Sequence, residues 1–497
     1  GNHDRKIAFV LQLIEDDPPT ILMPCLKKLL AHPGSDIKIQ VLKILQEHQD
    51  DSLLPEIEEL LNDTNFQVQL AAMQFLAKNR TIGLPLLREY AYDSSYRLRS
   101  AALLCAAWEY RNSTEFRGKC NFKKLLDDFI QRTDMSEIDE DERIFLLEIV
   151  AQVLGIVNDP RLNLFLINLL ESSHLQVQKA AITAAGQTRS TRFIPKLLRV
   201  LQINALRKPA REALAEFGED FIEWEISGEN MPEKPLAIQR EIPKVLAKIG
   251  SQKSVDLLFK MMPANDMKTR FESLRGLNRL RKEFPFLHFN EKEIDSNLSE
   301  EIELYAQHLL FRYAINNGSI LNKSSAGEKN KKEEEAAARL LIKALDERLN
   351  YTLERIFRLL GLKYPAADIY NAFLRITSNN SDLRAHAIEM LDNLLEFNWK
   401  RRIIPLVEHS NPDELIQNLR FIPSSDIPTE EKALQMILTA KDNWLKACAV
   451  YLIGVQKRLA SRNAVEQLIG HNDPLLQESA QFAMLKFNQS SAAGKNI

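Results

Sequence analysis

Basic side chains recur at helical spacing in the middle of the sequence, and no other residues in the chain have a pattern so suited to chemistry. Within each group the Lys and Arg residues stand three, four or seven positions apart, so they share one face of a helix. Guanidinium and ammonium groups arranged in this way bind phosphate or carboxylate groups. The groups are Arg240, Lys244 and Lys248; Arg275, Arg279 and Lys282; and Arg348, Arg355 and Arg358.

A second interpretation of the same pattern needs no ligand. Acidic residues accompany the basic ones, and ion pairs within or between helices would cancel much of the positive potential. The accompanying acids are Glu241, Glu272, Asp346, Glu347 and Glu354. Two alternatives therefore stay open for these helices: a positive patch that receives an anionic partner, or a set of solvated faces with structural ion pairs.

Signatures of catalysis and of metal binding are missing from the sequence. It contains no GxxxxGK[ST], GxGxxG, HExxH or GxSxG motif. The nine histidines are scattered, and the four cysteines form no CxxC pair. We therefore predict that the protein is not an enzyme, with no catalytic residue, no metal ligand and no cofactor.

The helices that carry the basic residues belong to a repeated pattern. The stretches "NDTNFQVQLAAMQFL" from Asn62 and "DSSYRLRSAALLCAA" from Asp93 both run from a polar turn into an apolar helix with paired alanines. Ile39, Val68 and Leu98 open successive helices of this kind 29 and 30 residues apart. A period of about 30 residues built from two helices is typical of an α-solenoid, because each pair can bury its apolar face only against its neighbours.

The repeated pattern resembles HEAT repeats, in particular the short variety found in phycobilin lyases. The resemblance covers nearly the whole chain and implies an all-α fold, a HEAT-repeat α-α superhelix. Composition agrees with this fold, since 16 glycines and 7% aromatic residues are few for a sheet-rich protein of 497 residues.

A polar stretch interrupts the predicted array. Residues 318–338, "GSILNKSSAGEKNKKEEEAAA", begin with Gly, Ser and Asn and continue with Lys and Glu, a composition that favours a flexible loop followed by a fraying helix start. We therefore predict two lobes separated by a flexible loop. The N-terminal HEAT-repeat lobe covers 1–316, the linker 317–334 and the C-terminal HEAT-repeat lobe 335–497.

A narrower resemblance rests on two central segments, "REIPKVLAKIG" (Arg240 to Gly250) and "LDERLNYTLERIFRLLGLKYP" (Leu345 to Pro365). They are similar to the soluble HEAT region of bacterial proteins in which a nucleotide-transporter domain of the ADP/ATP translocase type precedes the repeats. The resemblance implies a cytoplasmic module that is tethered to the inner membrane only through a fused domain. Because the chain starts at Gly1, we expect a piece of a longer protein.

Together these observations predict a non-catalytic interaction scaffold. Its partner would be another protein, the remainder of its own membrane protein or an anionic ligand, bound on a concave face that displays the nine basic residues. Nucleic-acid binding by the same stripes is the alternative, but the net charge of −3 and the four tryptophans, none within a stripe, disfavour it. A chromophore chaperone like the phycobilin lyases is a third alternative, for which the sequence offers no reactive cysteine or acidic pocket.

Overall fold

The computed structural model describes residues 2–14, 22–48, 53–79, 83–135, 139–228, 234–263, 266–321, 328–378, 380–408, 414–416 and 427–493. Throughout these ranges the regular elements are helices, and none of the described residues forms a strand. The predicted all-α fold is thereby confirmed. The chain divides into two compact units, residues 1–232 (unit 1) and residues 233–497 (unit 2).

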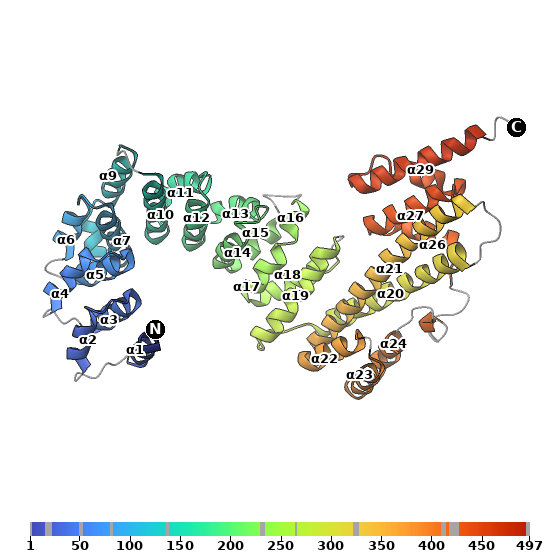
Figure 1. Ribbon diagram of the computed structural model, residues 1–497, viewed down its shortest axis with the longest axis horizontal. Helices are drawn as coiled ribbons and strands as arrows, with labels where there is room; N and C mark the ends of the chain where they lie inside the picture. Colours follow the sequence, from blue (N-terminus) through green and yellow to red (C-terminus); the bar gives the residue numbers. More distant parts are fainter. Residues whose placement is uncertain are drawn as a thin grey trace. The chain divides into compact units, whose positions relative to one another are not determined.

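Unit 1 is built from helix pairs. The longer second helices pack against one another in a row, and a shorter first helix packs on most of them (Figure 1). The row consists of α3 (Ser35–His48), α5 (Phe66–Lys78), α7 (Tyr96–Asn112), α10 (Glu140–Val157), α12 (Leu175–Thr188) and α14 (Arg207–Glu216). The other helices are α1 (Asn2–Leu13), α2 (Met23–Leu29), α4 (Leu54–Glu59), α6 (Gly83–Tyr90), α8 (Thr114–Lys119), α9 (Phe122–Met135), α11 (Asn163–Leu170), α13 (Ile194–Val200) and α15 (Glu219–Ser227).

Small residues let the helices of this row approach closely. Three of these helices contain an alanine pair, Ala71–Ala72, Ala101–Ala102 or Ala180–Ala181, and the second member of each pair is fully buried. The side chain of Asn65 caps α5 by accepting a hydrogen bond from the Gln67 amide at 2.8 Å, which satisfies one of the free donors at the helix start. The residue types that repeat in the sequence are therefore those that start a helix and those that pack it.

Unit 2 is organised around the hairpin of two long helices, α20 (Glu291–Ile315) and α21 (Glu328–Lys363), which pack along each other (Figure 1). Helices α17 (Ile242–Ile249), α19 (Met267–Glu283) and α21 pack in succession, with α18 (Gln252–Met261) on α19 and α16 (Leu236–Gln239) before α17. From α21, the helices α22 (Ala366–Ile376), α23 (Ser381–Leu394) and α24 (Phe397–Val407) pack one on the next. A second branch on α20 and α21 comprises α26 (Glu430–Thr439), α27 (Asn443–Val455), α28 (Arg462–Glu466) and α29 (Pro474–Ala493).

The predicted linker, 317–334, lies between helices that share one core. Phe311 before it and Leu345 after it are buried in the same cluster. Asn316–Leu321 forms a π-helical turn and α21 begins at Glu328, whereas residues 322–327 lie outside the described residues. The boundary between the compact units lies elsewhere, near residue 232, and the division into lobes 1–316 and 335–497 stays a prediction about the repeat array.

Candidate interaction face

The basic residues of α19 lie opposite its buried side. Leu274, Leu277 and Leu280 are fully buried, whereas Arg275, Arg279 and Lys282 are exposed. On α17 the same arrangement buries Val245 and Leu246 and leaves Lys244 half-buried and Lys248 exposed. The helical spacing of the stripes therefore translates into solvent-facing side chains on these two helices, as expected for amphipathic helices that pack by one side.

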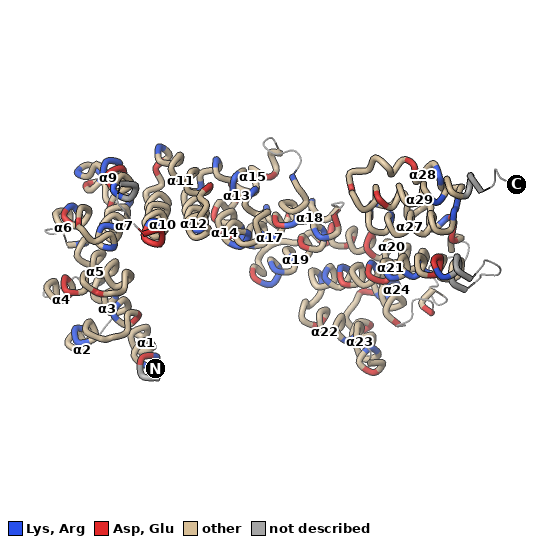
Figure 2. Tube along the Cα trace, turned by 45° about the horizontal axis from the view of Figure 1, so that its top comes forward, with Lys and Arg blue, Asp and Glu red and all other residues tan. Residues whose placement is uncertain are grey.

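Carboxylates lie between the cations of neighbouring helices. Lys244 Nζ is 2.9 Å from Glu241 and 3.9 Å from Glu272, and Arg275 is 3.3 Å from the same Glu272. One carboxylate thus lies within ion-pair distance of two cations, one on α17 and one on α19. Figure 2 shows basic and acidic residues close together around α17 and α19.

An aromatic ring connects α19 to α21. Phe271 lies under two guanidinium groups, with ring-centroid distances of 6.0 Å to Arg275 and 5.1 Å to Arg358. Arg358 also binds Glu354 at 2.6 Å, and Arg279 binds Glu283 at 2.9 Å. We use the name basic face for the six of the nine predicted cations that remain accessible on these three helices: Lys244, Lys248, Arg275, Arg279, Lys282 and Arg358.

The other three predicted residues are held in ion pairs. Arg240 makes two hydrogen bonds to Asp266, of 2.6 and 2.9 Å, and this interaction raises the pKa of the Arg240 guanidinium. Arg348 pairs with Asp442 at the start of α27, and both side chains are largely buried. These two arginines join helices within unit 2.

Arg355 requires a correction, because its side chain is only 1% exposed and pairs with Glu301 of α20 at 2.8 Å. Sequence spacing placed it on the same stripe as Arg358, three positions later. The neighbouring helix α20 covers that side of α21, so Arg355 contributes to the interior and not to an accessible face.

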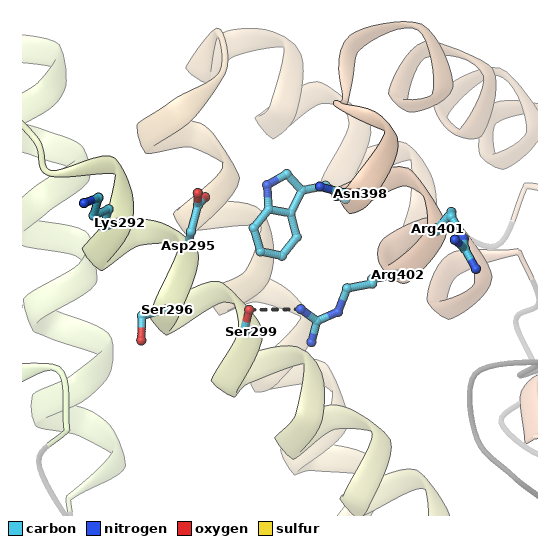
Figure 3. Close-up of a pocket in the computed structure, with 8 residues that line it drawn as sticks. Lys292, Asp295, Ser296, Ser299, Asn398, Arg401 and Arg402 are labelled. Atoms are coloured by element: carbon cyan, nitrogen blue, oxygen red, sulfur yellow. Dashed lines mark hydrogen bonds between the residues drawn. The ribbon is translucent and has the colours of Figure 1, made fainter.

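Sequence reasoning missed a groove between α20 and α24. Its volume is about 740 Å³, and it is lined by Lys292, Ser299, Trp399, Arg401 and Arg402 among others. Arg402 donates to Ser299 Oγ at 2.9 Å and lies 5.6 Å from the Trp399 ring centroid. Figure 3 shows Arg402 turned toward Ser299 and Arg401 pointing away. The cations of the groove therefore do not converge on one point. The segment "NWKRR" in α24, with Trp399 three positions before Arg402, is the signal that could have drawn attention to it.

The described residues offer little that suits reactive chemistry. Burial raises the pKa of the Cys105 thiol, and it raises that of Cys448 to about 12, so both thiols stay protonated at neutral pH. Across the described ranges no three His, Cys, Asp or Glu side chains are grouped so that they could hold a metal ion. No helix in the same ranges is both long and apolar enough to cross a membrane.

Comparison with known protein families identifies the repeat type. Residues 23–107 match the family of HEAT repeats. The matched HEAT repeats correspond to α2–α7 of unit 1. No curated protein matches the chain.

Solved structures with similar chains are distant in sequence. An engineered protein has 15% identity and a TM-score of 0.19, with 93% of this chain and 98% of that chain covered. A structure concerned with the interaction between cadherin and β-catenin has 11% identity and a TM-score of 0.27, with 94% and 99% covered. A structure of Kap95p with RanGDP has 11% identity and a TM-score of 0.31, with 98% and 82% covered. Likenesses at these scores say nothing about the function of this chain.

Proposed function

We propose that this protein is a non-catalytic scaffold that binds an acidic segment of a protein partner on the basic face of unit 2. The observation that carries the proposal is the row of Arg275, Arg279 and Lys282 on the solvent side of α19, between Lys248 of α17 and Arg358 of α21. Stacked helix pairs characteristically present extended surfaces of this kind to other proteins.

The charges of this face leave room for an acidic ligand. Six cations make up the face, and Glu241, Glu272, Glu283 and Glu354 form ion pairs with four of them. Exposed ion pairs such as Arg279 with Glu283 contribute only about 0–1 kcal/mol each. A partner carboxylate can therefore replace an exposed internal one such as that of Glu283 at little cost, and the cations of the face attract it.

Charge reversal tests the proposal. The variant carries Arg275→Glu, Arg279→Glu and Lys282→Glu, and the probe is a fluorescent octaglutamate peptide followed by anisotropy. We expect salt-sensitive binding to the wild type that weakens by more than about tenfold in the variant. The matched control reverses three exposed cations of unit 1, Arg117, Lys123 and Lys124. Equal weakening in the control, or no binding by the wild type, would overturn the proposal.

The nucleic-acid alternative is tested in the same titration with a duplex DNA of arbitrary sequence. Binding to phosphates would decrease steeply with salt, because each contact releases a counterion. If the duplex binds and the acidic peptide does not, the basic face is a nucleic-acid surface. If the peptide binds and the duplex does not, the protein-partner proposal holds.

We further propose that the chain works on the cytoplasmic side of a bacterial inner membrane, tethered through a fused transporter-like domain. Support comes from the two segments that resemble such proteins, 240–250 and 345–365, which include α17 and the C-terminal part of α21. The experiment is to express the whole reading frame from its native gene and to separate membranes from soluble protein with a carbonate wash. Recovery of the module only in the soluble fraction would contradict the proposal.

A further inference from the structure

Unit 1 contains a pocket whose lining is acidic and aromatic, opposite in charge to the basic face. It lies where α5, α7 and α10 begin, and its volume is about 560 Å³. Aromatic residues from all three helices line it: Phe66, Tyr96 and Phe145. Each of these rings is only partly buried, so part of each remains accessible to a ligand.

The three rings meet at steep angles. Phe66 and Phe145 have centroids 5.0 Å apart and ring planes at 89°, and Tyr96 and Phe145 have centroids 5.7 Å apart and planes at 78°. Such edge-to-face pairs are favourable and hold the rings in fixed orientations. Aromatic walls that stand at an angle to one another are the arrangement in which proteins surround ammonium groups.

Charge at the pocket is negative. Asp139, Asp141 and Glu142 line it with one cation, Arg97, and among the described residues no ion pair within 4.0 Å joins these carboxylates to a cation. Three carboxylates and one guanidinium leave two negative charges. Figure 2 shows the acidic residues gathered at one end of α10.

Arg97 shows that a cation already lies against one of these rings. Its guanidinium carbon is 5.7 Å from the Tyr96 ring centroid, and it donates to the Thr64 carbonyl at 2.9 Å. Acidic residues in the first turn of α10 also stabilise the helix dipole. The dipole explains the acids, but it does not explain why three separate helices begin with partly exposed rings around one cavity.

We propose that this pocket binds a lysine side chain from an extended basic segment of a protein partner. The ammonium group would lie against the aromatic rings and near Asp139 and Asp141, and the apolar stem of the lysine would contact the ring edges. The site lies in unit 1 and requires a ligand of opposite charge, so this inference goes beyond the proposed function and does not depend on it.

The probe for this site is a nine-residue Gly/Ser peptide with three lysines at alternate positions, followed by proton NMR and by titration. The ring currents of the aromatic residues that the ammonium group contacts should move the ε-methylene protons of lysine upfield. In the variant Asp139→Asn, Asp141→Asn, Glu142→Gln we expect about tenfold weaker binding. In Phe145→Leu, which keeps an apolar side chain but removes one ring, we expect a smaller upfield shift and weaker binding.

A matched control neutralises three other exposed carboxylates of unit 1, by Glu58→Gln, Glu59→Gln and Asp127→Asn. It should bind like the wild type. If the control weakened peptide binding as much as the pocket variant does, only the total charge would matter. If the wild type showed no ring-current shift, the rings would not contact lysine. Either result overturns the proposal. Melting curves of the pocket variants identify any loss of binding that is due to unfolding. The carboxamide variant changes only exposed or half-buried polar groups, so we expect it to fold and to report on binding alone.

Discussion

The row of second helices in unit 1 and the central helices of unit 2 solve the same packing problem with different residues. In unit 1 the contacts are made by side chains with almost no volume: a Cβ on Gly155 would be 2.9 Å from the Ala184 Cα atom, and one on Gly186 would be 2.7 Å from the Ala213 Cα atom. Between α19, α20 and α21 of unit 2 the contact contains Glu301, Arg355 and Arg270 instead.

The ionic contact fixes geometry more strictly than an apolar one. Glu301 is 2% exposed in its side chain and lies 2.8 Å from Arg355 and 3.4 Å from Arg270. Arg355 also donates to the Thr352 hydroxyl at 3.1 Å. A buried charge is stable only with its partner within ion-pair distance, so the pair favours the observed position of α20 along α21. Small residues, by contrast, allow the close repetition of identical pairs.

Removing the buried Glu301 carboxylate should have the largest effect on this difference between the two units. Glu301→Leu leaves Arg355 buried without its partner, and we expect unit 2 to lose about 3–5 kcal/mol of unfolding free energy. Urea denaturation measures the loss. The double variant Glu301→Leu, Arg355→Leu removes the two most deeply buried charges and leaves only Arg270, whose side chain is 22% exposed, so it should recover much of the stability. A single variant as stable as the wild type would show that the ionic contact does not hold these helices together.

Acid should weaken the same region of unit 2 through His308 on α20. Burial lowers the pKa of His308 from 6.5 to about 4, an effect that outweighs the nearby Asp442 carboxylate. Between these pH values the unfolded chain binds a proton that the folded protein excludes, so stability decreases as the pH decreases from 6.5 toward 4, by up to about 3 kcal/mol. Denaturation curves of the wild type and of His308→Gln should converge in this range. Curves that stay parallel would contradict the expectation.

Overpacking tests the small-residue row of unit 1. Gly186→Ala places a methyl group against the backbone of Ala213, and we expect a loss of about 1–3 kcal/mol because the backbone must shift. The matched control is Gly118→Ala in α8, where a Cβ would have no neighbour within 4 Å. This change should leave stability equal or slightly higher, since alanine favours helix. Similar melting temperatures for the two variants would mean that close approach is unimportant at this row.

The smallest effect is expected on the basic face. Arg279 and Glu283 form an ion pair 2.9 Å apart in which both side chains are more than 40% exposed. Replacing Arg279 by Gln should change the unfolding free energy by no more than about 0.5 kcal/mol. A double-mutant cycle with Glu283→Gln measures the pair directly. A coupling energy as large as that of the buried pair would erase the distinction between the two regions.

The regular part of the fold could be predicted from local patterns. A polar cap followed by an apolar helix, repeated about every 30 residues, predicts stacked helix pairs, and the capping by Asn65 and the buried Ala102 follow from residue type alone. Phe66 and Tyr96 even stand 30 positions apart, at equivalent places in successive repeats. What spacing could not show is that both rings contact Phe145 of a third helix.

By itself, the sequence determined the helices, their repetition and the face on which each basic residue lies, because these depend on neighbours three or four positions away. Only the tertiary structure decided which faces stay in water. Arg355 and Arg358 lie on the same stripe. Helix α20 covers Arg355, which forms an ion pair with Glu301. Arg358 lies beside Phe271, and 28% of its side chain is exposed. That difference depends on helices distant in sequence, and the desolvation of a charge is set by whatever packs over it.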